Sequence, residues 1–203
     1  TCEIACKDYK DLGVDFAYRH VYDCEGGDWQ MQSDGTYTQD CFVYHVSLGC
    51  QHCDDPACVK VCPTGASHIA EDGTVQIDKS KCIGCQFCAM ACPYNVRYLN
   101  EQERVVEKCT LCEQRIAQGE LPACVAQCGG RARFFGDLDK GIDSFEAPWV
   151  VDVTEGDPSY DKTERTRITL KECEQSDVHH LPDVGNGPGF VYILRDRDWQ
   201  GEE

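Results

Sequence analysis

Four cysteines lie within the sequence KCIGCQFCAMACPY at residues 81–94, and their spacing is C-x2-C-x2-C-x3-C-P. A related stretch, CQHCDDPACVKVCP, occupies residues 50–63. Thiolates that lie this close together bind metal ions or iron–sulfur clusters, or they form disulfides. The candidate metal ligands of these two stretches are Cys50, Cys53, Cys58, Cys62, Cys82, Cys85, Cys88 and Cys92.

The spacing of these two stretches favours iron–sulfur chemistry. A C-x2-C-x2-C loop is too short for regular structure, so it wraps around one small inorganic body, and Gly84 lets the backbone approach closely. The proline after the last cysteine has no N–H and ends a short helix. Disulfides are disfavoured by the dense triplets. Zinc usually needs cysteine pairs with a longer spacer, and this alternative stays open for the group Cys109, Cys112, Cys124 and Cys128 taken alone.

Composition limits the classes of protein. The chain has 203 residues, 41% of them hydrophobic, and 17 cysteines, which suits one large or two small domains. Its formal net charge of −17 argues against nucleic acid or an anionic membrane face as a partner. No apolar run is long enough to span a membrane. We find no acid–base pair, activated nucleophile or phosphate loop, which predicts that the chain has no catalytic site of its own.

The remaining sequence predicts short elements around the cysteines. Strands are expected at 42–48, after a turn within 71–78, and at 131–137. A short helix is expected within CEQRIAQGEL, residues 112–121, and should end near Gly119. Residues 7–40 are interpreted as a surface insertion. Residues 138–203 are polar with weak strand signals at 148–153 and 190–194, and are interpreted as an extended arm. The copies CVKVCPTGA, CAMACPYNV and CVAQCGGRA form an internal repeat, which implies pseudo-symmetric units.

The combined motifs resemble those of a known family. The run TCEIACKDYKDLG, GGDWQ, CQHCDDPACVKVCPTGA, KCIGCQFCAMACPY, KCTLCEQRIAQG and RARFFGD is similar to the four-cluster iron–sulfur (beta) subunit of the molybdopterin oxidoreductases, above all of anaerobic dimethyl sulfoxide reductases. The resemblance covers residues 1–137. It implies an α+β fold of two nested bacterial-type two-cluster ferredoxin-like modules: module A from 1–40 plus 100–137, and module B from 41–99. The arm at 138–203 would contact a partner subunit.

The resemblance also implies which cysteines share a cluster. One set is Cys50, Cys53 and Cys58 with the distant Cys92, and a second is Cys82, Cys85 and Cys88 with Cys62. The third is Cys109, Cys112 and Cys124 with Cys6. Cys2 and Cys128 belong to a fourth set.

Cys2 and Cys6 match the third and fourth cysteines of the family's first motif. Two further cysteines are therefore expected upstream of Thr1, and four 4Fe–4S clusters are expected in total. The remaining Cys24, Cys41 and Cys173 are interpreted as structural or free thiols. His52 and the pair His179 and His180 are not expected to be ligands.

The family further implies a function. The chain would relay single electrons between a quinol-oxidising membrane anchor subunit and a molybdopterin-containing catalytic subunit. It would be peripheral, membrane-associated through these partners, on the extracytoplasmic face or alternatively in the cytoplasm. Two alternatives stay open: a beta subunit of another molybdenum or tungsten enzyme (acting on polysulfide, formate, arsenic or selenium compounds, or transferring an aromatic hydroxyl group), or a free polyferredoxin. Cations beside the motifs should offset cluster charge, and the candidates are Lys60, Lys81, Arg97, Lys108, Arg115, Arg131 and Arg133.

Overall fold

The computed structural model describes residues 1–14, 16–130, 132–137 and 178–193. Only 178–193 of the predicted arm falls within these ranges. The weak strand signal at 148–153, Arg131 and Cys173 lie outside them. Short helices and two-stranded antiparallel ladders make up the described fold, as expected for an α+β protein.

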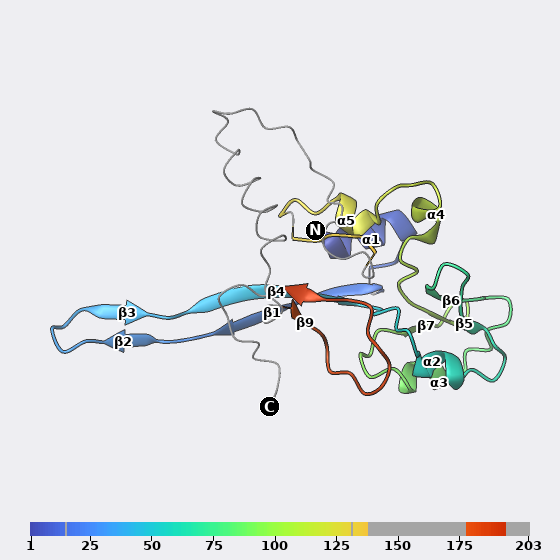
Figure 1. Ribbon diagram of the computed structural model, residues 1–203, viewed down its shortest axis with the longest axis horizontal. Coiled ribbons are helices and arrows are strands. Elements are labelled where there is room, and N and C mark those ends of the chain that lie inside the picture. The colour runs from blue at the N-terminus through green and yellow to red at the C-terminus, as the bar shows by residue number, and fades with distance from the viewer. Residues whose placement is uncertain (15, 131, 138–177, 194–203) are drawn as a thin grey trace.

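The helices fall into two groups (Figure 1). The helix α1 (Cys2–Lys10) packs against α5 (Ala123–Ala126), with α4 (Glu113–Ile116) nearby, and α2 (Ala57–Lys60) packs against α3 (Phe87–Met90). The expected helix before Gly119 is confirmed by α4, and Gly119 follows with a φ of +76°. Helix α1 was not anticipated.

A long antiparallel ribbon extends from this helical part (Figure 1). Strand β1 (Arg19–Gly26) pairs with β4 (Phe42–Gly49), in a register that sets Arg19 opposite Gly49. The ribbon continues as β2 (Trp29–Met31) paired with β3 (Tyr37–Gln39), and every residue of these two strands is exposed. The strand expected at 42–48 is therefore confirmed. The interpretation of 7–40 as a surface insertion holds for β2 and β3, but β1 begins at Arg19, which is buried.

Three short ladders complete the described structure. Strand β5 (Ser67–Ile69) pairs with β6 (Val75–Ile77), which confirms the strand within 71–78, and β7 (Tyr98–Asn100) pairs with β8 (Val105–Glu107). Strand β9 (Val178–His179) pairs with β10 (Tyr192–Ile193), inside the weak signal at 190–194. The strand expected at 131–137 is wrong for its described part, because 132–137 contains only an isolated bridge at Phe135.

Two of the predicted module boundaries separate segments that pair with each other. The boundary after residue 40 separates β1 from its partner β4, and the boundary after residue 99 falls within β7, which pairs with β8. These ladders tie the predicted modules to one another through backbone hydrogen bonds. The division into modules A and B stays a prediction.

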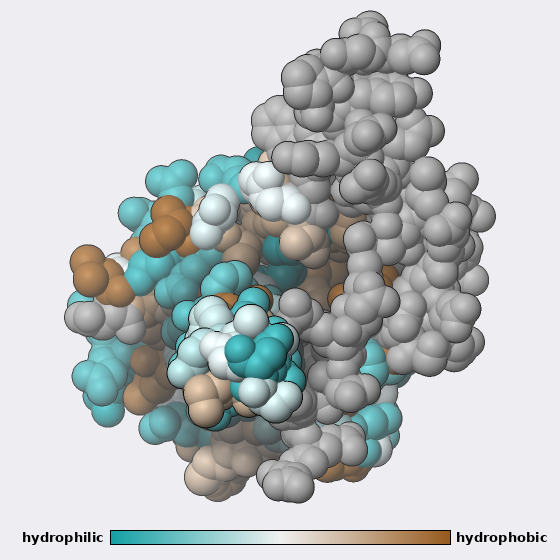
Figure 2. Space-filling model, turned by 90° about the vertical axis from the view of Figure 1, so that its left-hand side faces the viewer, coloured by the Kyte–Doolittle hydropathy of each residue, from teal (hydrophilic) through white to brown (hydrophobic). Residues whose placement is uncertain are grey.

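Cysteines take the place of aliphatic side chains in the core. One buried cluster contains Cys6, Cys50 and Cys109 together with Tyr18, Tyr94 and Val96. From the tip of the β2–β3 ribbon, apolar residues appear as separate brown patches between polar teal ones (Figure 2). None of the helices among the described residues has the length and apolar character needed to cross a bilayer.

The described part of the arm packs on the chain itself. The N–H groups of Asp54 and Asp55 donate to the carbonyls of Gly187 and Asn186, at 2.9 and 3.0 Å, and the Gly189 N–H donates to the Gln51 carbonyl at 2.9 Å. A Cβ added at Gly189 would lie 2.9 Å from that same carbonyl oxygen. Residues 178–193 therefore cover the cysteine motif at 50–63.

Candidate metal centres

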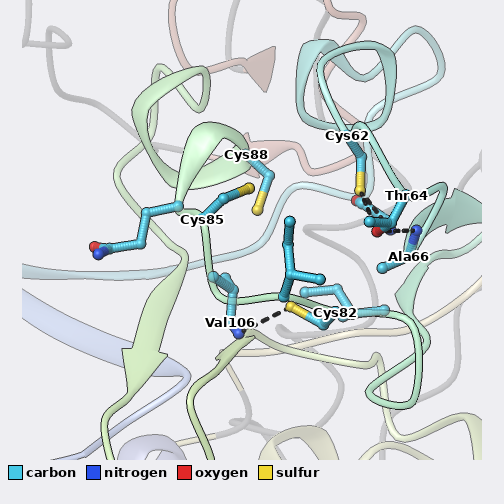
Figure 3. A pocket seen from close by; sticks show the side chains of 11 residues that line it. Cys62, Thr64, Ala66, Cys82, Cys85, Cys88 and Val106 are labelled. Carbon is cyan, nitrogen blue, oxygen red and sulfur yellow. Dashed lines mark hydrogen bonds between the residues drawn. The ribbon is translucent and has the colours of Figure 1, made fainter.

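Site 1 is a hollow between two cysteine motifs (Figure 3). Four thiols line it, from Cys62, Cys82, Cys85 and Cys88. Two of the sulfur atoms accept backbone hydrogen bonds: Ser67 N–H donates to Cys62 Sγ at 3.3 Å, and Val106 N–H donates to Cys82 Sγ at 3.4 Å. N–H donors of this kind stabilise a thiolate over a thiol.

The loop of site 1 depends on a left-handed backbone at Gly84. Its φ is +67°, and a Cβ at this position would lie 2.4 Å from the Arg104 carbonyl oxygen. Gln86 also has a positive φ, 63°, and leads directly into α3. The turn at Gly84 lets Cys82 and Cys85 lie beside one hollow, and α3 then adds Cys88.

Site 2 is a second hollow of the same kind, lined by the four thiols of Cys50, Cys53, Cys58 and Cys92. Arg97 and Asn186 also line it. Burial raises the pKa of the Cys53 thiol to about 12, and the other three cysteines of the site add to this effect. Four thiolates would therefore repel one another here unless a positively charged metal centre offset their charges.

The two hollows exchange one cysteine each. Cys58 lies on α2 and lines site 2, whereas Cys62, which follows the same helix, lines site 1. Cys88 on α3 lines site 1, whereas Cys92 lines site 2. The structure thus brings together the two sets that the family resemblance implied.

A third group of thiols gathers between α1 and α5. This group, site 3, consists of Cys6, Cys109, Cys112 and Cys124, and all four are buried. Burial raises the pKa of Cys6 to about 12, and the nearby Cys109 and Cys124 raise it further. The Leu111 N–H donates to Cys109 Sγ at 3.4 Å, in a loop where Leu111 and Cys112 both have positive φ.

Cys2 and Cys128, called site 4, belong to the same pair of packed helices. Cys2 is the first residue of α1, and its Sγ lies 3.3 Å from Ser47 Oγ. Cys128 follows α5 and is buried, and its Sγ accepts a hydrogen bond from Ala132 N–H at 3.3 Å. Helices α1 and α5 therefore repeat the arrangement of α2 and α3.

These donor sets suit a multi-atom iron–sulfur group. Within the described ranges, no three His, Cys, Asp or Glu side chains converge closely enough to hold a single metal ion. In sites 1 and 2 the thiols instead surround a hollow, and backbone N–H groups point at sulfur in sites 1, 3 and 4. Of the other cysteines, Cys24 is half-buried and Cys41 is exposed, and neither is in a disulfide.

The candidate cations differ in solvent exposure. Lys60 and Lys81 are exposed and form ion pairs with Asp55 and Asp78. Arg115 pairs with Glu120 at the surface.

The buried cations are Arg97 and Lys108, with exposures of 4% and 2%. The Lys108 ammonium donates to the Cys109 carbonyl at 2.6 Å and also acts electrostatically on Cys58, so it lies between sites 2 and 3.

Arg19 is a buried cation that the sequence did not point to. It is 1% exposed, and its Nη1 donates to the Ser47 carbonyl at 3.1 Å and to Ser47 Oγ at 3.3 Å. Its charge interacts with Cys109 and Cys124 of site 3 and with Cys2 of site 4. None of the cysteines of sites 1 to 4 lies near it in the sequence, and its pairing opposite Gly49 brings it here.

His52 has a structural role. It is buried, and its Nδ1 accepts a hydrogen bond from Val75 N–H at 3.2 Å. Burial lowers the pKa of His52 well below its usual value, and the charges of Lys108 and Arg19 lower it further. The ring therefore stays neutral and ties the site 2 loop to β6.

Known proteins share these motifs. Residues 41–138 match the family of 4Fe-4S dicluster domains. The B polypeptide of the anaerobic dimethyl sulfoxide reductase of Escherichia coli (strain K12) is 49% identical over 140 residues, which cover 69% of this chain and 68% of that protein. The thiosulfate reductase electron transfer subunit of Salmonella typhi is 44% identical over 140 residues, covering 68% of this chain and 69% of that protein.

The B polypeptide of the tetrathionate reductase of Salmonella typhimurium (strain LT2) is 48% identical over 112 residues, which cover 54% of this chain and 43% of that protein. These relatives are electron-transfer or B polypeptides of reductases, which agrees with the lack of a catalytic constellation in the sequence. The protein therefore belongs to the family of iron–sulfur electron-transfer subunits of the molybdopterin oxidoreductases, the group that contains the B polypeptides of the anaerobic dimethyl sulfoxide reductases.

Proposed function

We propose that the chain holds four 4Fe–4S clusters, one at each of sites 1 to 4, and relays single electrons along them. The observation that carries this proposal is the exchange of Cys62 and Cys92 between the two hollows. In bacterial two-cluster ferredoxins the fourth cysteine of each motif binds the other cluster, which is the same arrangement. Site 4 needs two cysteines besides Cys2 and Cys128.

The packing of helices supports two nested ferredoxin-like modules. Helices α2 and α3 would form the inner module around sites 1 and 2, and α1 and α5 the outer module around sites 3 and 4. Each cluster supplies a site that accepts and gives up one electron. The chain's own residues fix the clusters close to one another, exclude water, and set the local charge through buried cations and N–H donors.

We further propose that the partners are a molybdopterin-containing catalytic subunit and a quinol-oxidising membrane anchor subunit, with the complex on the extracytoplasmic face. Relatives named as dimethyl sulfoxide, thiosulfate and tetrathionate reductase components support a catalytic partner. A dimethyl sulfoxide reductase is the first candidate. A thiosulfate or tetrathionate reductase is the second, because those relatives are 44% and 48% identical. Assaying the purified complex with the three substrates separates these candidates.

The first experiment measures iron and acid-labile sulfide per chain anaerobically, together with an electron paramagnetic resonance (EPR) redox titration. Four clusters require about sixteen irons and as many sulfides. A value of about twelve would contradict a cluster at site 4. Zinc in place of iron would overturn the proposal as a whole.

A second experiment concerns the predicted arm. Residues 178–193 of the arm already pack on site 2 of this chain. We therefore propose that the preceding part of the arm, residues 138–177, contacts the catalytic subunit. Deleting 138–177 alone should weaken co-purification with that subunit while the iron content stays unchanged. Undiminished co-purification would contradict this role.

A further inference from the structure

Arg97 lines site 2 and also acts on a thiol of site 1. Its Nη2 donates a hydrogen bond to Cys58 Sγ of site 2 at 2.8 Å, and its side chain lines the site 2 hollow. It is also close enough to Cys88 of site 1 to interact with that thiol. Burial raises the pKa of Cys58 and of Cys88, and the positive charge of Arg97 opposes the rise at both.

The guanidinium of Arg97 has no anionic partner among the carboxylate side chains of the described residues. The ion pairs found there involve other cations, and Arg97 Nη1 is buried without a hydrogen-bond partner. A buried charge with no counter-charge is strongly unfavourable, and so is a buried N–H without an acceptor. The counter-charge therefore comes from the cysteine thiolates and from the group that they bind. A 4Fe–4S cluster with four thiolates carries a net charge of roughly −2 and presents sulfide acceptors.

The internal repeat contains the same feature a second time. Arg97 stands five residues after Cys92, and Arg133 stands five residues after Cys128. The Nε of Arg133 is also buried without a hydrogen-bond partner. In the first copy this position is Ser67, so the arginine is not a general requirement of the turn after a cysteine motif.

On the basis of the proposed cluster binding, we propose that Arg97 is the shared counter-charge of sites 1 and 2. Its guanidinium stabilises the extra negative charge when one electron resides at either site. It therefore raises the reduction potentials of both clusters together. An electron that passes between the two sites stays beside the same cation throughout, so the step costs little energy.

The test compares Arg97→Gln, Arg97→Lys and the control Lys60→Gln in the native complex. Lys60 lies between Cys58 and Cys62 in the sequence, but its side chain is exposed and paired with Asp55. The measurements are iron and sulfide content and an EPR-monitored redox titration. The signals of sites 1 and 2 are assigned with Cys62→Ser and Cys58→Ser.

We expect Arg97→Gln to lower the equilibrium constant for one-electron reduction of each cluster about tenfold. This lowers each reduction potential by about 59 mV. The other signals and all signals of Lys60→Gln should not move. Unchanged potentials at full iron content would overturn the proposal and leave cluster binding intact. A shift at one cluster alone would overturn the sharing.

Arg97→Lys decides the question if Arg97→Gln loses iron. Lysine keeps the charge, but its compact ammonium cannot form the planar fork that reaches two sulfurs. We expect this variant to assemble, with one of the two potentials close to wild type and the other lowered. Wild-type potentials at both sites would contradict the role of the guanidinium fork in reaching a sulfur of each site.

Discussion

Gly84 and Gly65 have nearly the same left-handed backbone, with φ of +67° and +66°, but different surroundings. A Cβ at Gly84 would meet the Arg104 carbonyl oxygen, whereas Gly65, in the loop between Cys62 and Ala66, has open space around it. The conformational cost of an L-residue, about 1–2 kcal/mol, is common to both positions. The close approach is present only at Gly84.

We therefore expect Gly84→Ala to lose the cluster of site 1, about four irons per chain, because the loop must move away from Arg104. Gly65→Ala is the matched control and should keep its iron. Iron content and the site 1 EPR signal measure the difference. Equal iron in the two variants would show that the close approach has no consequence.

Arg19 gives a second prediction at the scale of one residue. Replacement by Gln removes a buried charge that is hydrogen-bonded to Ser47 and stacked over Phe190. The Ser47 carbonyl loses the shorter of two side-chain hydrogen bonds and keeps the one from the Tyr192 hydroxyl at 3.5 Å, so we expect the free energy of unfolding to fall by about 1–3 kcal/mol. Lys81→Gln, which breaks an exposed ion pair, should change it by less than about 1 kcal/mol. Anaerobic denaturant titration compares the two midpoints, and equal midpoints would contradict this role.

At the scale of elements, α2 and α3 carry the exchange of ligands between sites 1 and 2. We expect Cys62→Ser to change the EPR signal of site 1, although three ligands of site 2 lie in the same motif as Cys62. Cys58→Ser should change site 2 instead. Cys41→Ser, at an exposed position outside the sites, should change neither. Identical effects of the first two variants would argue against the exchange.

Some elements could be predicted from sequence and others could not. The strand at 42–48 was predictable because its β-branched and aromatic residues suit a pleated surface. The segment 131–137 has similar composition, but its described part forms only an isolated bridge at Phe135, because pairing depends on distant residues. Helix α1 was missed because the sequence alone does not show the packing against α5 that stabilises so short a helix. Arg19 was missed for a similar reason, since the β1–β4 register places it.

The candidate ligands followed from sequence because short spacings force neighbouring thiols onto one metal centre. The identity of each distant fourth ligand came from the family resemblance, since spacing says nothing of which hollow Cys62 or Cys92 lines. The candidate cations show the same limit. Seven flank the motifs, but only the structure separates the buried Arg97 and Lys108 from the exposed Lys60 and Lys81.

At the scale of the whole molecule, residues 178–193 act as a cover for site 2. The Asn186 side chain accepts the Ala57 N–H at 3.2 Å, where α2 begins, and Asn186 itself is 5% exposed. This segment is far from the cysteine motifs in sequence, but it closes the hollow that they form. Solvent exposure of an iron–sulfur cluster influences its potential and its loss to oxygen.

We expect Asn186→Ala to remove the hydrogen bond to the Ala57 N–H and so to lower the free energy that holds residues 178–193 on site 2 by about 1 kcal/mol, the typical contribution of one hydrogen bond. The cluster of site 2 should then be lost faster in air, which the decay of its visible absorbance measures. Val184→Ala, in the same loop at a position 70% exposed, should decay at the wild-type rate. Equal decay in the two variants would show that the cover does not protect site 2.

In the proposed four-cluster arrangement, the positions of the ligands along the chain also set an order of assembly during synthesis. Every ligand of sites 1 and 2 lies between Cys50 and Cys92, so a growing polypeptide can complete this half early. Site 3 brings Cys6 together with Cys124, which closes a long loop. This site cannot form until Cys124 has left the ribosome. A nascent polypeptide therefore carries its earliest thiols unprotected for longest, and the cell must keep them reduced until the last part of the site is translated.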